Sequence, residues 1–440
     1  MVQRGIPRGA AVLLVILLSV AGTSAQEQPV RVFTNARIIP IAGPVIDKGV
    51  LVVREGKIVA VGPAGRVQMP AGAEVHDLAG KVLMPGLVDT HSHIGNISGG
   101  DSSAAIQPDV RVLDSLDAHS SSLRRAQAGG ITTVNVMPGS GLLLSGQTLY
   151  LKLRKARTVE SLLIRLPGGR IAGGLKMANG TNSLRAAASG PLPGTRAKSA
   201  ALAREQFVKA VEYRDKLRKA GNDPEKRPAR DLALETLVEV LEGQRTVHFH
   251  THRHDDIVTV LRLAKEFGFT PVLQHVSEGW KVADEIAAAG APCSVIVLDS
   301  PGGKLEAIDV AMDTGAVLDK AGVLTAFHTD DWITDSRLFL RSAALAVRAG
   351  MPRDRALYAL TMAGARMLQL DDRVGTLEAG KDADFIVLSG DPLSVYTRVE
   401  QTWVEGSKVF DLTNPDDHLH AVGGYGANRG EGWVAHEEEQ

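Results

Sequence analysis

Cysteine is nearly absent from this chain of 440 residues, with Cys293 as the single one. One cysteine cannot form an intrachain disulfide, so the fold has to be held by its core rather than by covalent cross-links. Cys293 lies in the segment 291–295, which we expect to be a buried strand. A catalytic thiol is therefore not expected, because a buried thiol in apolar surroundings is inert.

The chain also lacks an excess of charge of either sign. Its 49 Lys and Arg residues balance 50 Asp and Glu residues, which leaves a net charge of -1. This balance gives no reason to expect nucleic acid or an anionic membrane surface as a partner. We expect a small-molecule substrate instead and leave a homo-oligomer open. Aromatic residues are scarce at 4%, whereas the hydrophobic content of 44% supports a full core.

The apolar run at the N-terminus is too short to span a bilayer. Residues 10–21 are apolar, and a transmembrane helix needs roughly 20 such residues. Arg4 and Arg8 precede the run, and the small residues Thr23-Ser24-Ala25 follow it. This order is typical of a secretory signal peptide. We predict a signal peptide at 1–25, cleavage after Ala25 and an exported protein, periplasmic or secreted, without membrane attachment afterwards. An uncleaved anchor is the alternative.

Short β-rich segments occur at both ends of the chain. We expect strands at 31–39, 49–54, 57–62, 383–388, 401–405 and 408–410. Such strands need a partner sheet to bury their apolar face. We therefore predict that residues 29–84 and 373–412 together form one small β-sandwich. The segment 413–440 is expected to be a tail that is disordered at its end.

Residues 85–372 change to an alternation of strands and helices, which favours a parallel sheet and an α/β fold. The clearest unit is a strand at 246–251 followed by a helix at 256–267. About eight units can be counted when two less certain strands in 145–178 are included. This is the number for a (β/α)₈ TIM barrel. An open doubly wound sheet is the alternative, although no Gly-x-Gly-x-x-Gly follows an early strand.

Histidines and acidic residues recur where the expected strands end. His91 and His93 lie at the end of the first strand, on one face because side chains alternate along a strand. Further candidates follow the fifth, sixth and eighth strands: His248, His250, His252, His275, His328, Asp330 and Asp331. The carboxyl ends of barrel strands meet at one mouth. Imidazoles from three strands and a carboxylate from a fourth suit Zn²⁺ or a similar metal at an open catalytic site.

The same residues lie in motifs that resemble a known family. The motifs are PGLVDTHSH at 85–93, VHFHTH at 247–252, QHV at 274–276, HTDD at 328–331 and GTLEAGKDADFIVL at 375–388. On these motifs the chain resembles the metal-dependent amidohydrolase superfamily, and within it the imidazolonepropionase-like and prolidase-like branch. The resemblance covers nearly the whole mature chain. It implies a TIM barrel flanked by a β-sandwich, in agreement with the pattern of elements.

The resemblance also implies a set of metal ligands, namely His91, His93, His250, His275 and Asp330. His248 and His252 share the face parity of His250. The family's apolar–His–small pattern favours His250, and His252 would then contact substrate. Asp331 competes with Asp330, which is preferred because the family's aspartate follows a small or hydroxyl residue. His328 faces either the barrel or the helices.

Binuclear relatives carry a carboxylated lysine on the fourth strand, where it bridges two metal ions. Lys176 matches that position, and Lys152 is the reserve candidate. A lysine among apolar neighbours has a depressed pKa, which carbamate formation requires. With the bridge the site holds two metal ions, and without it one.

The implied chemistry is metal-assisted hydrolysis, in which Asp330 accepts a proton from water and passes it to the leaving nitrogen. His275 or His252 would stabilise the oxyanion. We expect an exported amidohydrolase that cleaves an amide or peptide-like C–N bond of dipeptides or N-acyl amino acids. A cyclic-amide hydrolase or a deaminase is one alternative, and a catalytically silent metal-binding protein is another.

Overall fold

The computed structural model describes residues 1, 29–97, 101, 103–184, 193–296, 304–331, 333–424 and 427. Apart from Met1, the expected signal peptide lies outside these residues. At the end of the expected tail, residues 425–440 also lie outside them, except for residue 427. No helix in the described part of the chain is long and apolar enough to cross a membrane.

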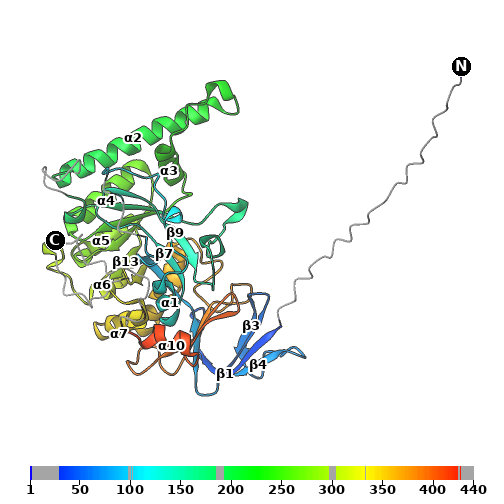
Figure 1. Ribbon diagram of the computed structural model, residues 1–440. Coiled ribbons are helices and arrows are strands. Elements are labelled where there is room, and N and C mark those ends of the chain that lie inside the picture. The colour runs from blue at the N-terminus through cyan, green and yellow to red at the C-terminus, as the bar shows by residue number, and fades with distance from the viewer. Residues whose placement is uncertain are drawn as a thin grey trace.

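Both ends of the chain build one β-domain (Figure 1). Its strands form a single eight-stranded sheet in the order β17-β16-β15-β5-β1-β2-β3, with β4 paired to β1. The strands are β1 (Arg31–Ile38), β2 (Ile46–Arg54), β3 (Lys57–Pro63), β4 (Glu74–Asp77), β5 (Val82–Pro85), β15 (Phe385–Leu388), β16 (Val399–Val404) and β17 (Ser407–Asp411). The junction is the antiparallel pair of β5 and β15, which brings Met84 opposite Ile386. Phe33, Phe385 and Trp403 pack together in the core of this domain.

The middle of the chain forms two further sheets. One has the order β14-β13-β12-β11-β10-β8 and the other the order β6-β7-β9. Their strands are β6 (Leu87–Ser92), β7 (Ile131–Val136), β8 (Leu144–Gln147), β9 (Leu149–Lys152), β10 (Leu175–Ala178), β11 (Val247–Thr251), β12 (Pro271–His275), β13 (Cys293–Ile296) and β14 (Thr325–His328). The amide of Asp330 donates to the carbonyl of His91 at 2.9 Å, and this bond links the segment after β14 to β6. The carboxyl ends of β6 and β14 therefore meet.

One part of this framework departs from a regular succession of strand and helix. β8 runs antiparallel to β10, and β9 runs antiparallel to β7. The expected strands in 145–178 exist, but no crossover helix joins β7 to β8. Residues 137–143 are too few for the dozen or more that a parallel crossover needs, so the chain turns back on itself. The count of eight regular strand–helix units was wrong here.

Helices cover the outside of the barrel strands (Figure 1). They are α1 (Ser121–Ala128), α2 (Arg196–Ala220), α3 (Leu232–Leu241), α4 (His254–Phe267), α5 (Ala283–Ala289), α6 (Thr314–Lys320), α7 (Phe339–Arg348), α8 (Arg353–Ala359), α9 (Met362–Met367) and α10 (Pro415–Val422). The last of these lies within the expected tail. Asn414 starts it by accepting hydrogen bonds from two backbone amides, at Asp416 and Asp417.

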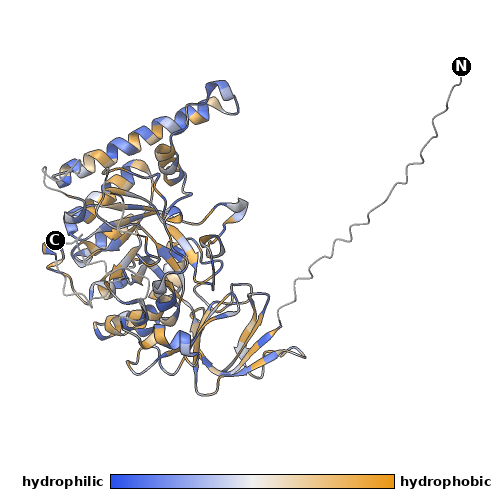
Figure 2. Ribbon diagram, viewed as in Figure 1, coloured by the Kyte–Doolittle hydropathy of each residue, from blue (hydrophilic) through white to orange (hydrophobic). Residues whose placement is uncertain are grey.

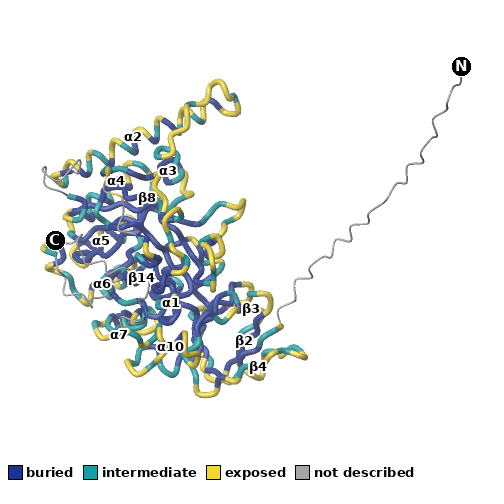
Figure 3. The backbone as a smooth tube through the Cα atoms, viewed as in Figure 1, coloured by how far each residue is buried: buried dark blue, intermediate teal, exposed yellow. Residues whose placement is uncertain are grey.

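The main core lies between these helices and the barrel strands. Every residue of β11, β12, β13 and β14 is buried, as expected for parallel strands covered on both faces. Figure 2 shows the alternation of apolar and polar residues along the helices, and Figure 3 shows that the buried residues gather in the strands. Cys293 is fully buried in β13, and burial raises the pKa of its thiol. A structural thiol was the expectation.

Candidate metal centre

The first strand of the barrel presents two imidazoles at its carboxyl end. The Nε2 atoms of His91 and His93 are 3.3 Å apart. The Nδ1 of His93 lies 2.8 Å from the carbonyl oxygen of Met137, which can only accept, so this nitrogen carries the proton. When His93 is neutral, its Nε2 therefore holds the lone pair. The alternation expected for the strand end thus places both rings together.

The amide of Gln274 orients His91 from the neighbouring side. Its Nε2 donates to the Nδ1 of His248 at 3.0 Å, and its Oε1 lies 3.3 Å from the Nδ1 of His91. The oxygen accepts, so the Nδ1 of His91 is the donor and its Nε2 keeps the lone pair. His91 and His93 hence present the same ring nitrogen toward the same space.

The structure gives different surroundings to His248 and His250 on β11 and to His252, which directly follows it. His248 has both nitrogens engaged, since its Nε2 also lies 2.7 Å from the hydroxyl of Tyr150. Both nitrogens of His250 are buried without a hydrogen-bond partner among the described residues. The ring of His250 packs against His275, with the ring centroids 4.4 Å apart. The structure therefore brings His250, and not His248, to the group of imidazoles.

His252 lies two residues after His250, just beyond the end of β11. Its ring stacks on that of His275, with the ring centroids 5.0 Å apart. Its Nδ1 is 2.7 Å from the hydroxyl of Ser277, and its Nε2 has no partner within the described residues. The Nε2 of His275 is also buried and unpartnered there. Together, His250, His252 and His275 form one group of three ligand atoms within 4.8 Å of one another.

His275 enters this group through an unusual backbone conformation. Its φ is 72°, in the left-handed region that a residue with a Cβ seldom adopts. The preceding Gln274 reaches His91 and His248 inside the barrel, so strict alternation would turn His275 outward. The left-handed backbone directs both side chains inward. Asp330 has a φ of 49°, so two of the expected ligands carry backbone strain, which is typical of functional sites.

Asp330 joins the imidazoles of the first strand. Its Oδ1 lies 3.0 Å from the Nε2 of His93 and 3.4 Å from that of His91, forming a second group of three ligand atoms. The carboxylate of Asp331 instead accepts hydrogen bonds from the amide and the hydroxyl of Ser336. Asp331 therefore does not take part in either group.

The two lysines named from the sequence lie in different surroundings. Lys176 on β10 is fully buried, with its Nζ 3.2 Å from the Nε2 of His91. Lys152 on β9 forms ion pairs with Asp384 at 2.5 Å and with Asp382 at 2.9 Å. Both aspartates lie directly before β15 of the β-domain. The structure thus places Lys176 at the candidate centre and Lys152 at the junction of the two domains.

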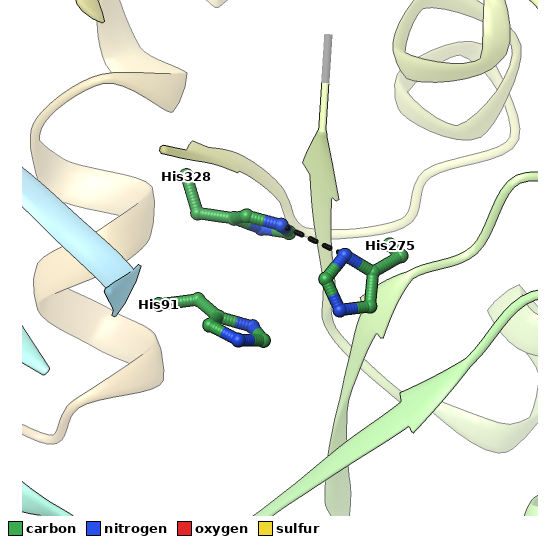
Figure 4. Close-up of side chains that lie close together, drawn as sticks. All are labelled: His91, His275 and His328. Atoms are coloured by element: carbon green, nitrogen blue, oxygen red, sulfur yellow. Dashed lines mark hydrogen bonds between the residues drawn. The ribbon is translucent and has the colours of Figure 1, made fainter. Parts of the chain in front are cut away.

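His328 is the residue whose direction the sequence left open, and it faces the barrel interior. Figure 4 shows its ring beside those of His91 and His275. The Nε2 of His328 lies 3.1 Å from the Nδ1 of His275, and its ring stacks on His91 with centroids 4.9 Å apart. Sequence reasoning did not assign it a role. It also missed Gln274, Tyr150, Ser277 and Ser294, whose side chains hold the imidazoles, because such polar residues on buried strands carry no distinctive spacing.

Burial governs the protonation states at the centre. Desolvation lowers the pKa of His252 and of His328 to about 3, and it lowers that of Lys176 to about 7. Burial alone would raise the pKa of Asp330, but its hydrogen bond to His93 and the cationic neighbours outweigh it and hold that pKa below the usual range. The imidazoles of His91, His250, His252, His275 and His328 are therefore neutral, Asp330 is anionic, and the Lys176 ammonium loses its proton readily.

The arrangement fits a bound divalent metal ion. Ring nitrogens of His91, His93, His250, His252 and His275 lie in two groups of closely spaced ligand atoms. Several of them find no donor among the described residues. Buried acceptors without a donor are costly, and a cation satisfies them. Imidazole and carboxylate are ligands that Zn²⁺ accepts. Two groups of three ligand atoms, one with Asp330 and one with His250, offer places for two ions.

Comparison with known proteins identifies the family of the chain. The model of the amidohydrolase family matches residues 82–414, so the chain belongs to the amidohydrolase family. Membership supports a hydrolase that acts on carbon–nitrogen bonds, and the fold of the structural neighbours implies a TIM barrel with a β-sandwich. The resemblance to this superfamily, based on the sequence motifs, is confirmed.

Individual relatives are more distant. The chain is 26% identical to imidazolonepropionase from Mesorhizobium japonicum, over 83% of this chain and 93% of that protein. It is also 26% identical to the amidohydrolase tasK of Hapsidospora irregularis over 83% of its own length, but it spans only 39% of that protein. The crystal structure of an amidohydrolase from Thermotoga maritima superposes with a TM-score of 0.81 at 34% identity, covering 87% of this chain and all of that one.

Proposed function

We propose that this protein is a metal-dependent hydrolase that cleaves an amide or peptide-like C–N bond in dipeptides or N-acyl amino acids. The observation that carries the proposal is the convergence of unprotonated imidazole nitrogens beside Asp330 and Lys176. A divalent ion bound there lowers the pKa of water and polarises a carbonyl. Such chemistry suits hydrolysis of an unactivated amide, which needs both a nucleophile and an electrophile.

The ligands proposed are the residues that the sequence motifs predict. His91, His93 and Asp330 would hold one ion, and His250 with His275 would hold a second, with Zn²⁺ as the expected metal. Lys176 would link the two as a carbamate formed with carbon dioxide. Its low pKa supports this, because only the neutral amine reacts. Without the carbamate, the centre would hold one ion.

The residues of this chain would then divide the proton transfers. Asp330 is anionic and touches His93, so it can accept the proton of the attacking water and return it to the leaving nitrogen. His252 has a free Nε2 and an Nδ1 held by Ser277. It is therefore placed to contact the substrate, and it or His275 would stabilise the oxyanion once protonated or ligated.

We also propose export of the protein through the leader at residues 1–25. Its basic start, apolar centre and small residues before the cleavage site support this. The near-zero net charge supports a small-molecule substrate over nucleic acid or a membrane surface, and the oligomeric state is left to measurement.

The test is a substrate panel on the mature protein, with mass-spectrometric detection of the products. We expect hydrolysis of at least one dipeptide or N-acyl amino acid, and loss of that activity in the Asp330→Asn variant. A cyclic amide is the second candidate, favoured by the identity to imidazolonepropionase, and release of ammonia would identify a deaminase. Metal binding without turnover of any of these would contradict the proposal and leave a silent metal-binding protein.

A further inference from the structure

A chain of hydrogen bonds runs from His275 to the wall of the barrel. The Nδ1 of His275 meets the Nε2 of His328 at 3.1 Å. The Nδ1 of His328 lies 2.7 Å from the hydroxyl of Ser294 on β13, and that hydroxyl lies 2.5 Å from the hydroxyl of Thr90 on β6. All of these residues are buried, with His328, Ser294 and Thr90 fully excluded from solvent. The chain therefore links the neighbouring strands β12, β14, β13 and β6 through buried side chains.

The direction of the protons along this chain follows from its inner end. The Nε2 of His275 is buried and has no partner among the described residues, and the ring packs against those of His250 and His252. If this nitrogen offers its lone pair, the ring proton of neutral His275 is on Nδ1. His275 then donates to the Nε2 of His328, which must be an acceptor.

The contacts of His328 with Ser294 and of Ser294 with Thr90 complete the assignment of the protons. A neutral His328 that accepts at Nε2 carries its proton on Nδ1 and donates it to the hydroxyl of Ser294. Ser294 in turn has its own proton available for Thr90. Each donor in the series thus has one acceptor, and a single pattern of protons satisfies the whole series. A hydroxyl rotates to suit its partner, so Ser294 can fix the tautomer of His328 without a charge.

We infer that His328 is a positioning residue, which holds His275 in the tautomer and orientation that present its Nε2 to the metal centre. The inference rests on the proposed function, since it concerns a ligand of that centre. Ligating histidines are commonly held by a partner on their other ring nitrogen, and loss of such a partner typically weakens metal binding about 10- to 100-fold. What is particular to this chain is that a second imidazole, directly before the Thr329–Asp331 segment, supplies this partner.

Direct ligation by His328 is the competing interpretation, because His91, His275 and His328 also form a compact group of three. The contacts disfavour it. The Nε2 of His328 is directed to the Nδ1 of His275, as Figure 4 shows, and its Nδ1 to Ser294. Both ring nitrogens are therefore occupied by protein partners, whereas those of His250 have none among the described residues.

The experiment measures the affinity of the metal-stripped mature protein for Zn²⁺ by competition with a fluorescent chelator. Three variants act on the series at different points: His328→Leu removes the acceptor, His328→Gln places an amide oxygen near the former Nε2, and Ser294→Ala removes the outer partner. Thr133→Val is the matched control, because Thr133 lies buried on β7 and its hydroxyl has no partner among the described residues. Circular dichroism of each metal-free protein checks that it folds.

We expect His328→Leu to weaken Zn²⁺ binding about 10- to 100-fold at the His275 site. His328→Gln should restore most of the affinity, and Ser294→Ala should lie between them. The control should match the wild type. The visible spectrum of the Co²⁺-loaded His328→Gln variant should resemble that of the wild type, because the ligand set is unchanged. If His328→Leu does not fold, the comparison of His328→Gln with Ser294→Ala still applies.

Two results would overturn the inference. Equal Zn²⁺ affinity in the wild type, His328→Leu and Ser294→Ala would show that His275 needs no such partner. Loss of one whole metal equivalent in His328→Gln, with a changed Co²⁺ spectrum, would make His328 a ligand instead. A wild-type protein that binds no Zn²⁺ would refute the proposed function as well, so the two failures are distinguishable.

Discussion

The buried ion pairs of Lys152 allow a prediction that separates stability from metal binding. Replacing Lys152 with Met removes the cation that pairs with Asp384 at 2.5 Å and with Asp382 at 2.9 Å. Asp382 keeps Lys57 at 2.6 Å and Arg373 at 2.9 Å, so its charge stays compensated. Asp384 keeps only the backbone amide of Glu405 among its described partners.

The expected loss of stability follows from this difference between the two carboxylates. Removing one partner of a buried ion pair typically costs about 3–5 kcal/mol, since the other charge is left buried alone. Because only one of the two carboxylates is left without a cation, we expect the lower end, about 3 kcal/mol in the free energy of unfolding. Urea unfolding followed by fluorescence measures it, and Trp403 reports on the β-domain in which Asp384 is anchored.

The pH dependence gives a further check. Burial already raises the pKa of Asp384 above its usual value. Without Lys152 that pKa rises further. Asp384 then binds a proton in the folded variant at pH values at which it is ionised in the unfolded chain. The stability deficit should therefore shrink as the pH falls toward 4 and grow as it rises. The double variant Lys152→Met/Asp384→Asn should recover most of the loss. A deficit below about 1 kcal/mol, the scale of a surface ion pair, would refute the reasoning. A loss of bound metal would show that Lys152, and not Lys176, serves the centre.

Three further predictions concern the centre itself. Asp330→Asn should lower kcat about 10²- to 10⁴-fold, whereas Asp331→Asn should leave kcat almost unchanged and affect only stability; steady-state kinetics on the first substrate found compares them. Lys176→Met should reduce bound zinc from about two equivalents per chain to one, by elemental analysis, if the carbamate bridges two ions. The metal-free protein should be labile to acid, since buried imidazoles have folded pKa values below 6.5 and the unfolded chain takes up protons first as the pH falls. Each buried imidazole should lower the free energy of unfolding by up to about 1.4 kcal/mol per pH unit below 6.5. Asp89, with its raised pKa of about 7, partly offsets this loss. Bound Zn²⁺ should move the midpoint of an acid titration, followed by circular dichroism, to lower pH. The imidazoles concerned are His91, His248, His250, His252, His275 and His328.

Much of the centre was predictable from the sequence, because its residues lie at the ends of strands with clear patterns. The alternation of β6 places His91 and His93 together, and the parity of β11 limits the choice to three histidines. Parity alone could not choose among the three. That choice depends on Tyr150 and Gln274, which occupy His248 from elements distant in the sequence.

Two features were beyond sequence reasoning for physical reasons. The inward turn of His275 comes from a left-handed backbone, which no glycine or turn motif announces at that position. The antiparallel course of β8 and β9 depends on pairing with β7 and β10, and short strands with similar composition do not reveal their direction. Both features shape the site, since they determine where His275 and Lys176 lie.

The most direct test of the central claim is the metal content per chain of the purified mature protein, measured with its hydrolytic activity before and after chelation and after reconstitution with Zn²⁺. The account predicts about one or two equivalents of a divalent metal, loss of hydrolysis on chelation, and recovery when the metal returns. A protein that hydrolyses its substrate equally well without metal, or that takes up none on reconstitution, would contradict the account.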